Sequence, residues 1–137
     1  MVLALGAIAT VRAQASPAEV AVPDGFTQHL AGRINDYRIR NGLAPLNWSD
    51  ELTTLASEHS QDMAGERRLS HDGFRERRRR SLSRMCVENV AHNFPTAETL
   101  LDGWRRSPGH LRNLLEPKVE RMGLAASDRF VTFFACR

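Results

Sequence analysis

The chain has 137 residues, a length that allows one ordinary domain and excludes two. Hydrophobic residues make up 42% and charged residues 26%, a balance that excludes a disordered or fibrous protein. The net charge is +3, and of the 19 basic residues all but Lys118 are arginines. Whether this charge indicates a nucleic-acid-binding protein depends on where the arginines lie.

The first fifteen residues predict export. Residues 1–11 are uncharged and mostly apolar, and Ala13-Gln14-Ala15 has the small-x-small pattern of a signal-peptidase site. The apolar run is about half as long as a membrane-spanning helix, so we expect no transmembrane segment after cleavage. We expect a signal peptide at 1–15, truncated at its start because no basic residue precedes the apolar run, then a linker at 16–25. A short apolar N-terminal helix is the alternative.

The expected export bears on whether the two cysteines form a disulfide. Cys86 and Cys136 are an even pair in an oxidising compartment, where a disulfide is the default. It would close a loop of about 50 residues and contribute roughly 4 kcal/mol of stability in the chain-entropy model. The alternative is two separate buried thiols. No Cys or His at zinc-finger spacing accompanies them.

Helical patterns fill most of the chain after the linker. Apolar residues recur at helical spacing from Phe26 to the stop at Asn41-Gly42, and an extended connector covers 43–48. A second helix begins at the N-cap Ser49 and frays at Gly65. We expect a third helix over 96–106 and a short fourth helix that Ser107 caps, with Pro108 in its first position.

The C-terminal part of the chain has the pattern of strands. Residues 119–125 and 129–136 are short apolar runs separated by the turn-like residues 126–128, which predicts a hairpin. Residues 87–91 are a candidate further strand. Helices that precede an antiparallel hairpin favour an α+β fold over a doubly wound α/β sheet. We expect one domain over 26–137.

Polar residues capable of chemistry gather near His71, near Glu88 and around His110, and they occur within five blocks of characteristic order and spacing. Together the blocks resemble the bacterial branch of the CAP superfamily, the SCP-like domains related to cysteine-rich secretory proteins, antigen 5 and pathogenesis-related proteins. The resemblance covers about residues 30 to 135. The blocks are Asn35-Asp36-Tyr37-Arg38 with Gly42-Leu43-Ala44-Pro45-Leu46, Ala56-Ser57-Glu58-His59-Ser60-Gln61-Asp62-Met63, Ser70-His71, Glu88-Asn89-Val90-Ala91, and Trp104-x-x-Ser107-Pro108-Gly109-His110-x-x-Asn113-Leu114-Leu115.

The resemblance implies a three-layer α-β-α sandwich with a small antiparallel sheet, an extracytoplasmic location and a cleft lined by two histidines and one or two acidic residues. Carried over by position, the histidine pair is His71 and His110, and the first glutamate is Glu88. The second glutamate of the eukaryotic members falls at Ser107 here, which puts in doubt any mechanism that needs two carboxylates. In some members the histidines bind a divalent metal such as zinc.

The residue types support metal binding even without the family resemblance. Two neutral imidazoles are good zinc ligands, so His71 and His110 are the candidate metal ligands of a weak site. Water on such a metal could be acidified, with Glu88 as a candidate base. Asn89 either lines the cleft or bonds a loop backbone, and Ser107 is better explained as a helix cap than as a nucleophile beside His110. We expect no dedicated nucleophile.

The other histidines have simpler explanations. His59 lies on the apolar stripe of the second helix, and we expect a hydrogen-bonded core residue there. His29 and His92 match no pattern, so we expect both to be surface groups.

The positive charge is concentrated in one segment. Residues 67–84 contain eight arginines and only two acidic residues. Such runs attract polyanions, and outside the cytoplasm these are anionic lipids or polysaccharides rather than nucleic acid. The alternative is an ordinary solvated loop or short helix. The candidate polyanion patch is Arg75, Arg77, Arg78, Arg79 and Arg80.

We therefore expect a secreted or periplasmic, monomeric binding module that holds a small molecule, a lipid or an envelope partner in a His/Glu cleft. Two alternatives remain open. One is a metal-assisted hydrolase of peptide, lipid or cell-wall substrates, and the other is an envelope interaction protein with a vestigial cleft.

Overall fold

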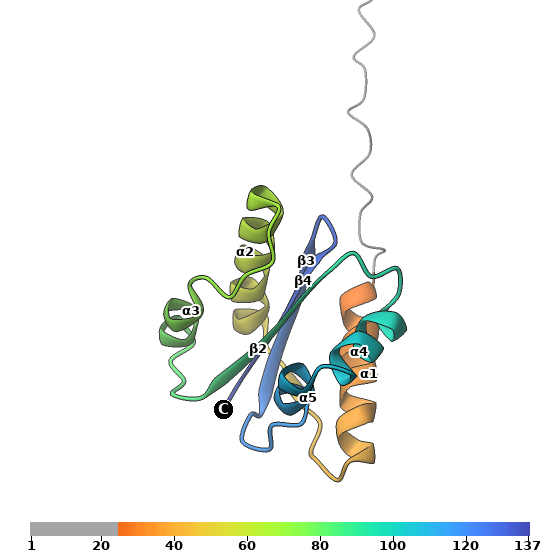
Figure 1. Cartoon of the computed structure of the whole chain (residues 1–137). Coiled ribbons are helices and arrows are strands. Elements are labelled where there is room, and N and C mark those ends of the chain that lie inside the picture. Colours follow the sequence, from red (N-terminus) through yellow and green to blue (C-terminus); the bar gives the residue numbers. More distant parts are fainter. Residues whose placement is uncertain (1–24) are drawn as a thin grey trace, which may run out of the picture.

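The computed structural model describes residues 25–137. The expected signal peptide and all but the last residue of the expected linker lie outside the described residues. Figure 1 shows the order of the elements along the chain. They are α1 (Phe26–Arg40), β1 (Asn47–Trp48), α2 (Asp50–Glu66), α3 (Phe74–Arg80), β2 (Cys86–His92), α4 (Ala97–Arg105), α5 (Pro108–Leu114), β3 (Arg121–Ser127) and β4 (Phe130–Cys136).

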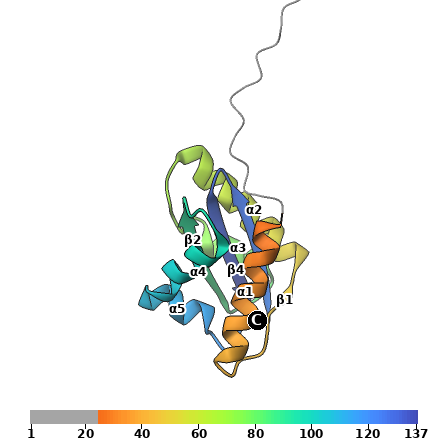
Figure 2. The same ribbon diagram turned by 90° about the vertical axis from the view of Figure 1, so that its right-hand side faces the viewer.

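The elements form three layers. Helices α2 and α3 lie on one side of the sheet, and α1, α4 and α5 lie on the other (Figure 1). Seen after a quarter turn, β4 remains in the middle of the molecule (Figure 2). The α+β class and the three-layer α-β-α sandwich expected from the sequence are therefore confirmed.

The sheet has the strand order β1-β3-β4-β2. Strands β2, β4 and β3 are antiparallel, whereas the two-residue β1 runs parallel to β3. The expected antiparallel sheet is present in β2, β4 and β3, and the parallel β1 adds to it at an edge where the sequence indicated only an extended connector. The Asn35 side chain holds the connector in place through both backbone polar groups of Leu46, at 2.8 and 3.0 Å.

Strand β4 is the centre of the core. All seven of its residues are buried, because strands flank it on both edges and helices cover both faces. Phe133 packs into the cluster shared with α1, α4 and α5, and Phe134 packs into the cluster shared with α2. Burial on both faces explains why apolar residues occupy both alternating positions of this strand, with only Thr132 polar.

Several boundaries differ from the expected ones. Strand β3 continues to Ser127, and the hairpin turn consists of Asp128 and Arg129, which both have positive φ angles of 45° and 62°. Such two-residue turns match the twist of the paired strands. Helix α2 passes through Gly65 to Glu66, and the arginine run forms the short helix α3.

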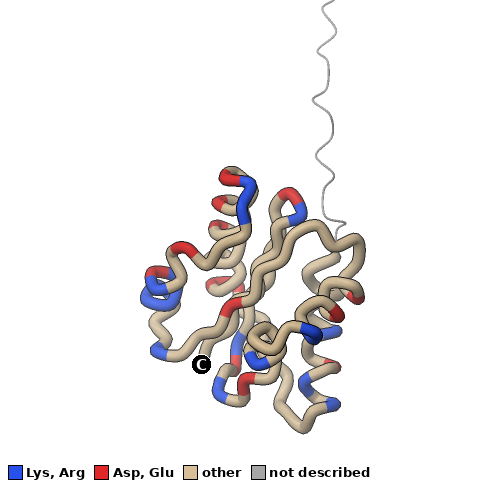
Figure 3. Tube along the Cα trace, in the orientation of Figure 1, with Lys and Arg blue, Asp and Glu red and all other residues tan. Residues whose placement is uncertain are grey.

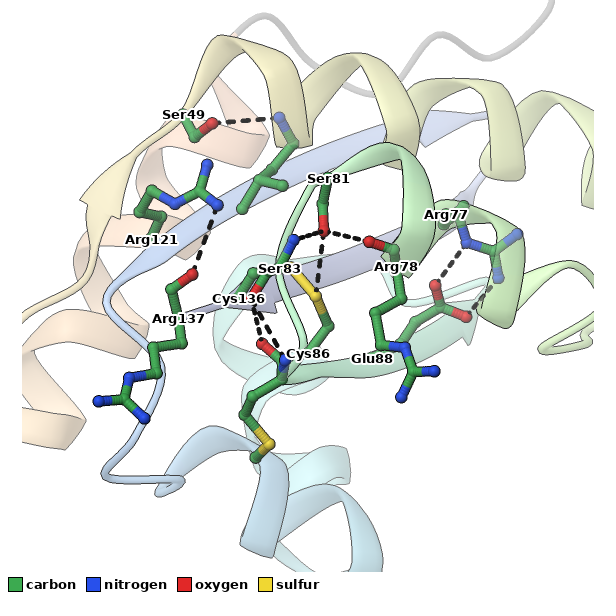
Figure 4. The surroundings of a disulfide bond; sticks show 12 residues. Ser49, Arg77, Arg78, Ser81, Ser83, Cys86, Glu88, Arg121, Cys136 and Arg137 are labelled. Atoms are coloured by element: carbon green, nitrogen blue, oxygen red, sulfur yellow. Dashed lines mark hydrogen bonds and ion pairs between the residues drawn. A yellow bond between two sulfur atoms is a disulfide. The ribbon is translucent and has the colours of Figure 1, made fainter.

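The expected disulfide joins Cys86 to Cys136. The two cysteines are register partners at the end of the β2–β4 ladder, and the bond lies in a buried cluster with Leu55 and Phe134. Figure 4 shows this bond beside Ser81 and the loop that follows α3. It thereby fixes the strand that carries Glu88 to the central strand of the sheet.

Gly123 of β3 allows α2 to pack directly on the sheet. A Cβ atom at this position would lie 2.2 Å from backbone atoms of Leu52 and Thr53, which cannot move independently of the helix. We predict that Gly123→Ala lowers the free energy of unfolding by about 3 kcal/mol or more. Urea denaturation followed by circular dichroism measures this change.

Gly32 in α1 provides the matched control, because no atom lies within 4 Å of its Cβ position. Gly32→Ala should raise the free energy of unfolding by about 0.5–1 kcal/mol, since alanine favours a helix interior. Equal effects of the two substitutions would contradict the close approach of α2 to β3.

Candidate functional site

The site is built around the buried carboxylate of Glu88. Its side chain is only 1% exposed, and β2 directs it toward α3. The Arg77 guanidinium donates two hydrogen bonds of 2.7 Å, from Nε to Oε2 and from Nη2 to Oε1. Figure 4 shows these two contacts between α3 and β2. This bidentate geometry is the strongest form of an arginine–carboxylate pair.

His71 also uses the Glu88 carboxylate. Its Nδ1 donates to Oε1 of Glu88 at 2.9 Å, and its side chain is 53% exposed. Because a carboxylate only accepts, Nδ1 carries the proton and the neutral ring keeps Nε2 as an acceptor. The same arrangement orients histidines that bind metals.

The loop before α3 is held by a second histidine. His59 of α2 is buried, as expected, and its Nε2 donates to the Ser70 carbonyl at 2.7 Å. The same nitrogen lies 3.8 Å from Oε1 of Glu88. Arg77 adds a 2.7 Å hydrogen bond from Nη1 to the Asp72 carbonyl. The backbone on both sides of His71 is thus fixed.

The environment keeps Glu88 ionised. Burial alone would raise the pKa of this carboxyl group, but the hydrogen bonds from His71 and Arg77 and the positive charge of Arg77 outweigh burial, so the pKa lies below its ordinary value. A carboxylate with a lowered pKa whose oxygens both accept hydrogen bonds is a poor proton acceptor. The geometry therefore gives Glu88 the role of orienting His71.

Asn89 does not line a cleft. It is fully buried, its Nδ2 donates to the His110 carbonyl at 3.0 Å, and its Oδ1 accepts from Asn113 Nδ2 at 2.9 Å. Asn113 also donates to the Glu88 carbonyl at 3.1 Å. Of the two explanations that the sequence left open, the structure places Asn89 in a backbone contact, one that attaches α5 to β2.

His110 lies on α5 with its ring 6.4 Å from that of Trp104, measured between centroids. Partial burial lowers the pKa of His110, and the positive charge that His71 can carry lowers this pKa further. At a given pH a larger fraction of this imidazole is therefore neutral than in an ordinary histidine. A neutral imidazole can bind a metal or accept a hydrogen bond.

A shallow depression of about 280 Å³ opens beside His71. Its apolar wall comes from the start of α3 and from β2, and its polar groups come from three different elements. His110 and Ser107 are not among its lining residues. The lining residues are His71, Phe74, Cys86, Val87, Glu88 and Asn113.

Ser107 also differs from the helix cap that the sequence predicted. It occupies the N-cap position of α5, with Pro108 next to it, but its side chain makes no capping hydrogen bond. The N–H groups in the first turn of α5 therefore do not bond the Ser107 hydroxyl, and α5 is attached to β2 through Asn89 and Asn113. The side-chain cap expected from the sequence is therefore wrong.

The metal ligands expected from the sequence are the imidazoles of His71 and His110. Among residues 25–137, no group of three or more His, Cys, Asp and Glu side chains is arranged to hold a metal ion. The bond to Glu88 leaves Nε2 of His71 as an acceptor. Two imidazoles are fewer than the four ligands of a closed structural zinc site.

The arginines of residues 75–80 differ in their burial and in their ion-pair partners. Arg77 is buried against Glu88, which corrects its assignment to a surface patch. Arg79 pairs with Glu76 of the same helix, and Arg80 pairs with Glu58 of α2. Arg75 and Arg78 are exposed.

Sequence reasoning missed Arg77, Phe74 and Asn113 as site residues. Phe74 and Arg77 are three positions apart, the spacing at which a short helix places two side chains on one face. That spacing could have separated Arg77 from its exposed neighbours. Nothing in the sequence paired Arg77 with Glu88, eleven positions later.

The buried pair gives a mutational prediction. Arg77→Met should lower the free energy of unfolding by about 3–5 kcal/mol, because it leaves the Glu88 carboxylate buried without its main partner. The double variant Arg77→Met/Glu88→Met should be more stable than Arg77→Met alone. Arg79→Met is the control on the same helix, and because its pair with Glu76 is exposed to solvent, the free energy of unfolding should change little. Equal losses in Arg77→Met and Arg79→Met would contradict the buried ion pair.

The lowered pKa of Glu88 gives a pH prediction. A carboxyl group with a pKa lowered by folding stabilises the protein above its ordinary pKa of 4.5, and this stabilisation is lost as the pH falls through the lowered value. We expect Glu88→Gln to be less stable than wild type near neutral pH and to lose less stability on acidification. Urea midpoints measured over acid pH test this. Glu120→Gln, which changes an exposed residue, should keep the wild-type profile, and parallel wild-type and Glu88→Gln profiles would contradict the assignment.

Comparison with known proteins places these features in a family. The model of the CAP, or cysteine-rich secretory protein, family matches residues 31–136. The uncharacterized membrane protein YlbC of Bacillus subtilis is 27% identical over 105 residues, which are 72% of this chain and 30% of that protein. The uncharacterized protein YkwD of the same organism is 29% identical over 106 residues, 72% of this chain and 41% of that protein. The chain thus spans less than half the length of these relatives.

Solved structures show the same fold. An extracellular SCP-domain protein from Bacillus anthracis has a TM-score of 0.78 and 28% identity, and covers 85% of this chain and 44% of its own. A cysteine-rich secretory protein from Staphylococcus aureus has a TM-score of 0.77 and 22% identity over 85% and 40% of the two chains. An outer surface protein from Borrelia burgdorferi has a TM-score of 0.74 and 20% identity over 85% and 96%. Among residues 25–137, no helix is long and apolar enough to cross a membrane. The chain belongs to the CAP (cysteine-rich secretory protein) family.

Proposed function

We propose that this CAP domain is an exported, non-catalytic binding module whose ligand meets the depression beside His71. One observation carries the proposal: both oxygens of Glu88 accept hydrogen bonds from Arg77 and His71. Glu88 is the acidic residue that a hydrolase would use as a base. Here its carboxylate orients His71 instead. The group left for a ligand is Nε2 of His71.

Export is supported by three independent features. The N-terminal sequence has a signal-peptide pattern, and the Cys86–Cys136 disulfide suits an oxidising compartment. Two of the solved structures of similar fold are described as extracellular or outer-surface proteins. A periplasmic or secreted location accounts for all three.

The depression favours a ligand that enters only in part. Its volume of about 280 Å³ is at the lower limit of small-molecule sites. Phe74 and Val87 provide apolar contact, while His71 and Asn113 provide hydrogen-bonding groups. A protruding group of a lipid or of an envelope partner fits this combination.

A weakly bound divalent metal belongs to the proposal. His71 and His110 would hold it, with water or a ligand atom at the open positions. The metal would supply a Lewis acid that attracts an anionic or carbonyl oxygen of the ligand. The oriented Nε2 of His71 and the neutral ring of His110 support this assignment.

Binding can be tested on protein purified from its native envelope fraction. Native mass spectrometry should show an added mass, metal or ligand, that is lost in His71→Ala and retained in His29→Ala. His29 is an exposed histidine of α1 that bonds Glu98 and lies outside the site. An added mass that persists in His71→Ala would contradict the site, and turnover of peptide, ester or cell-wall substrates that disappears in Glu88→Gln would favour the hydrolase.

Titration with Zn²⁺ alone tests the metal. Calorimetry should detect weak uptake by the full chain and none by His71→Ala or His110→Ala, while His29→Ala behaves as wild type. Uptake that is unchanged in either site variant would remove that histidine from the metal site.

A further inference from the structure

Helix α3 presents a different surface, which the depression does not use. It lies at the edge of the molecule beside α2, and Figure 3 shows basic residues concentrated there. Three of its arginines are engaged: Arg77 with Glu88, Arg79 with Glu76, and Arg80 with Glu58. The exposed Arg75 and Arg78, and Arg84 in the loop after the helix, have no ion-pair partner in the described part of the chain.

Leu82 lies between these arginines in the sequence. It is 95% exposed, the most exposed of the large apolar side chains of residues 25–137. Its φ angle is +59°, a left-handed conformation that a leucine adopts at a cost. The side chain therefore neither packs in the core nor suits its backbone, and the folded domain alone gives no reason for a leucine here.

We propose that Arg75, Arg78, Leu82 and Arg84, the α3 surface, dock the domain on a bilayer of anionic lipids. The guanidinium groups pair with lipid phosphates, and Leu82 enters the boundary between headgroups and acyl chains. The docking is independent of the ligand proposed for the depression.

The charge distribution favours this surface over the rest of the domain. Residues 67–84 hold eight arginines and two acidic residues. The other described residues carry ten basic and twelve acidic side chains. Attraction to an anionic bilayer therefore comes from the segment that contains α3, and it orients the domain as well as binding it.

Leu82 distinguishes a lipid bilayer from an anionic polysaccharide. A polysaccharide chain offers phosphate or carboxylate groups but no apolar interior, so an exposed leucine contributes nothing to its binding. A bilayer interacts favourably with both kinds of side chain, because its phosphates pair with the arginines and its apolar interior accepts the leucine. Phe74 begins α3 and also lines the depression, so docking would hold the depression beside the bilayer.

Sedimentation of the full chain with vesicles tests the proposal. We expect binding to vesicles of phosphatidylglycerol and phosphatidylcholine, weakening with salt, and little binding to phosphatidylcholine alone. Arg75→Gln/Arg78→Gln/Arg84→Gln should lower the partition coefficient by about a hundred-fold. The control Arg40→Gln/Arg106→Gln/Arg112→Gln removes the same charge from exposed arginines in α1, directly after α4 and in α5, and should have little effect.

Leu82→Asn tests the apolar contact without harming the fold. Asparagine tolerates the left-handed conformation, so thermal stability should stay the same or rise, while vesicle binding should fall by about tenfold. Every variant keeps residues 1–24, so their contribution cancels. Equal losses in the two triple variants would overturn the docking surface. Vesicle binding that is unchanged in Leu82→Asn would overturn the bilayer in favour of a polyanion such as a cell-wall polymer.

Discussion

A buried glutamate carboxylate costs several kcal/mol unless its partners compensate the lost hydration. Glu88 finds that compensation in Arg77 and His71, which come from α3 and from the loop before it. Because β2 carries Glu88 and the Cys86–Cys136 bond attaches β2 to β4, the ion pair connects α3 to the centre of the sheet. The position of His71, and thus of the depression, depends on this interaction, and the bonds from His59 to Ser70 and from Arg77 to Asp72 add to it.

Helix α5, on the other side of the depression, is attached to the sheet by side-chain amide hydrogen bonds rather than by an ion pair. Asn89 and Asn113 join β2 to α5 through each other and through the His110 and Glu88 carbonyls. Neutral hydrogen bonds between buried groups fix a geometry without introducing a reactive centre. These bonds attach α5 to the strand that carries Glu88, and so fix the side of the depression that Asn113 lines.

Much of the fold could be predicted from local patterns. The helical spacing of Leu30 and Ile34 and the N-cap at Ser49 identified helices that the structure contains. The apolar residues within 129–136 indicated a strand of a hairpin, and the even cysteine count indicated the disulfide. The parallel strand β1 could not be predicted, because it exists only through pairing with β3, more than seventy residues later.

The candidate site, like the fold, could be predicted from the sequence only in part. His71 and Glu88 were found through motifs, and the structure brings their side chains together at 2.9 Å. Arg77 could not be distinguished from the arginines around it, since its burial follows from how α3 lies against β2. Asn89 was identified as important, but its role needed the position of α5, which no local pattern contains.

The tautomer of His71 tests the central claim most directly. Long-range ¹H–¹⁵N NMR distinguishes the two nitrogens of a neutral imidazole. We predict that His71 carries its proton on Nδ1 in the wild-type protein, and that this preference weakens in Glu88→Gln. A neutral His71 protonated on Nε2, or a tautomer unaffected by Glu88→Gln, would contradict the role assigned to the Glu88 carboxylate.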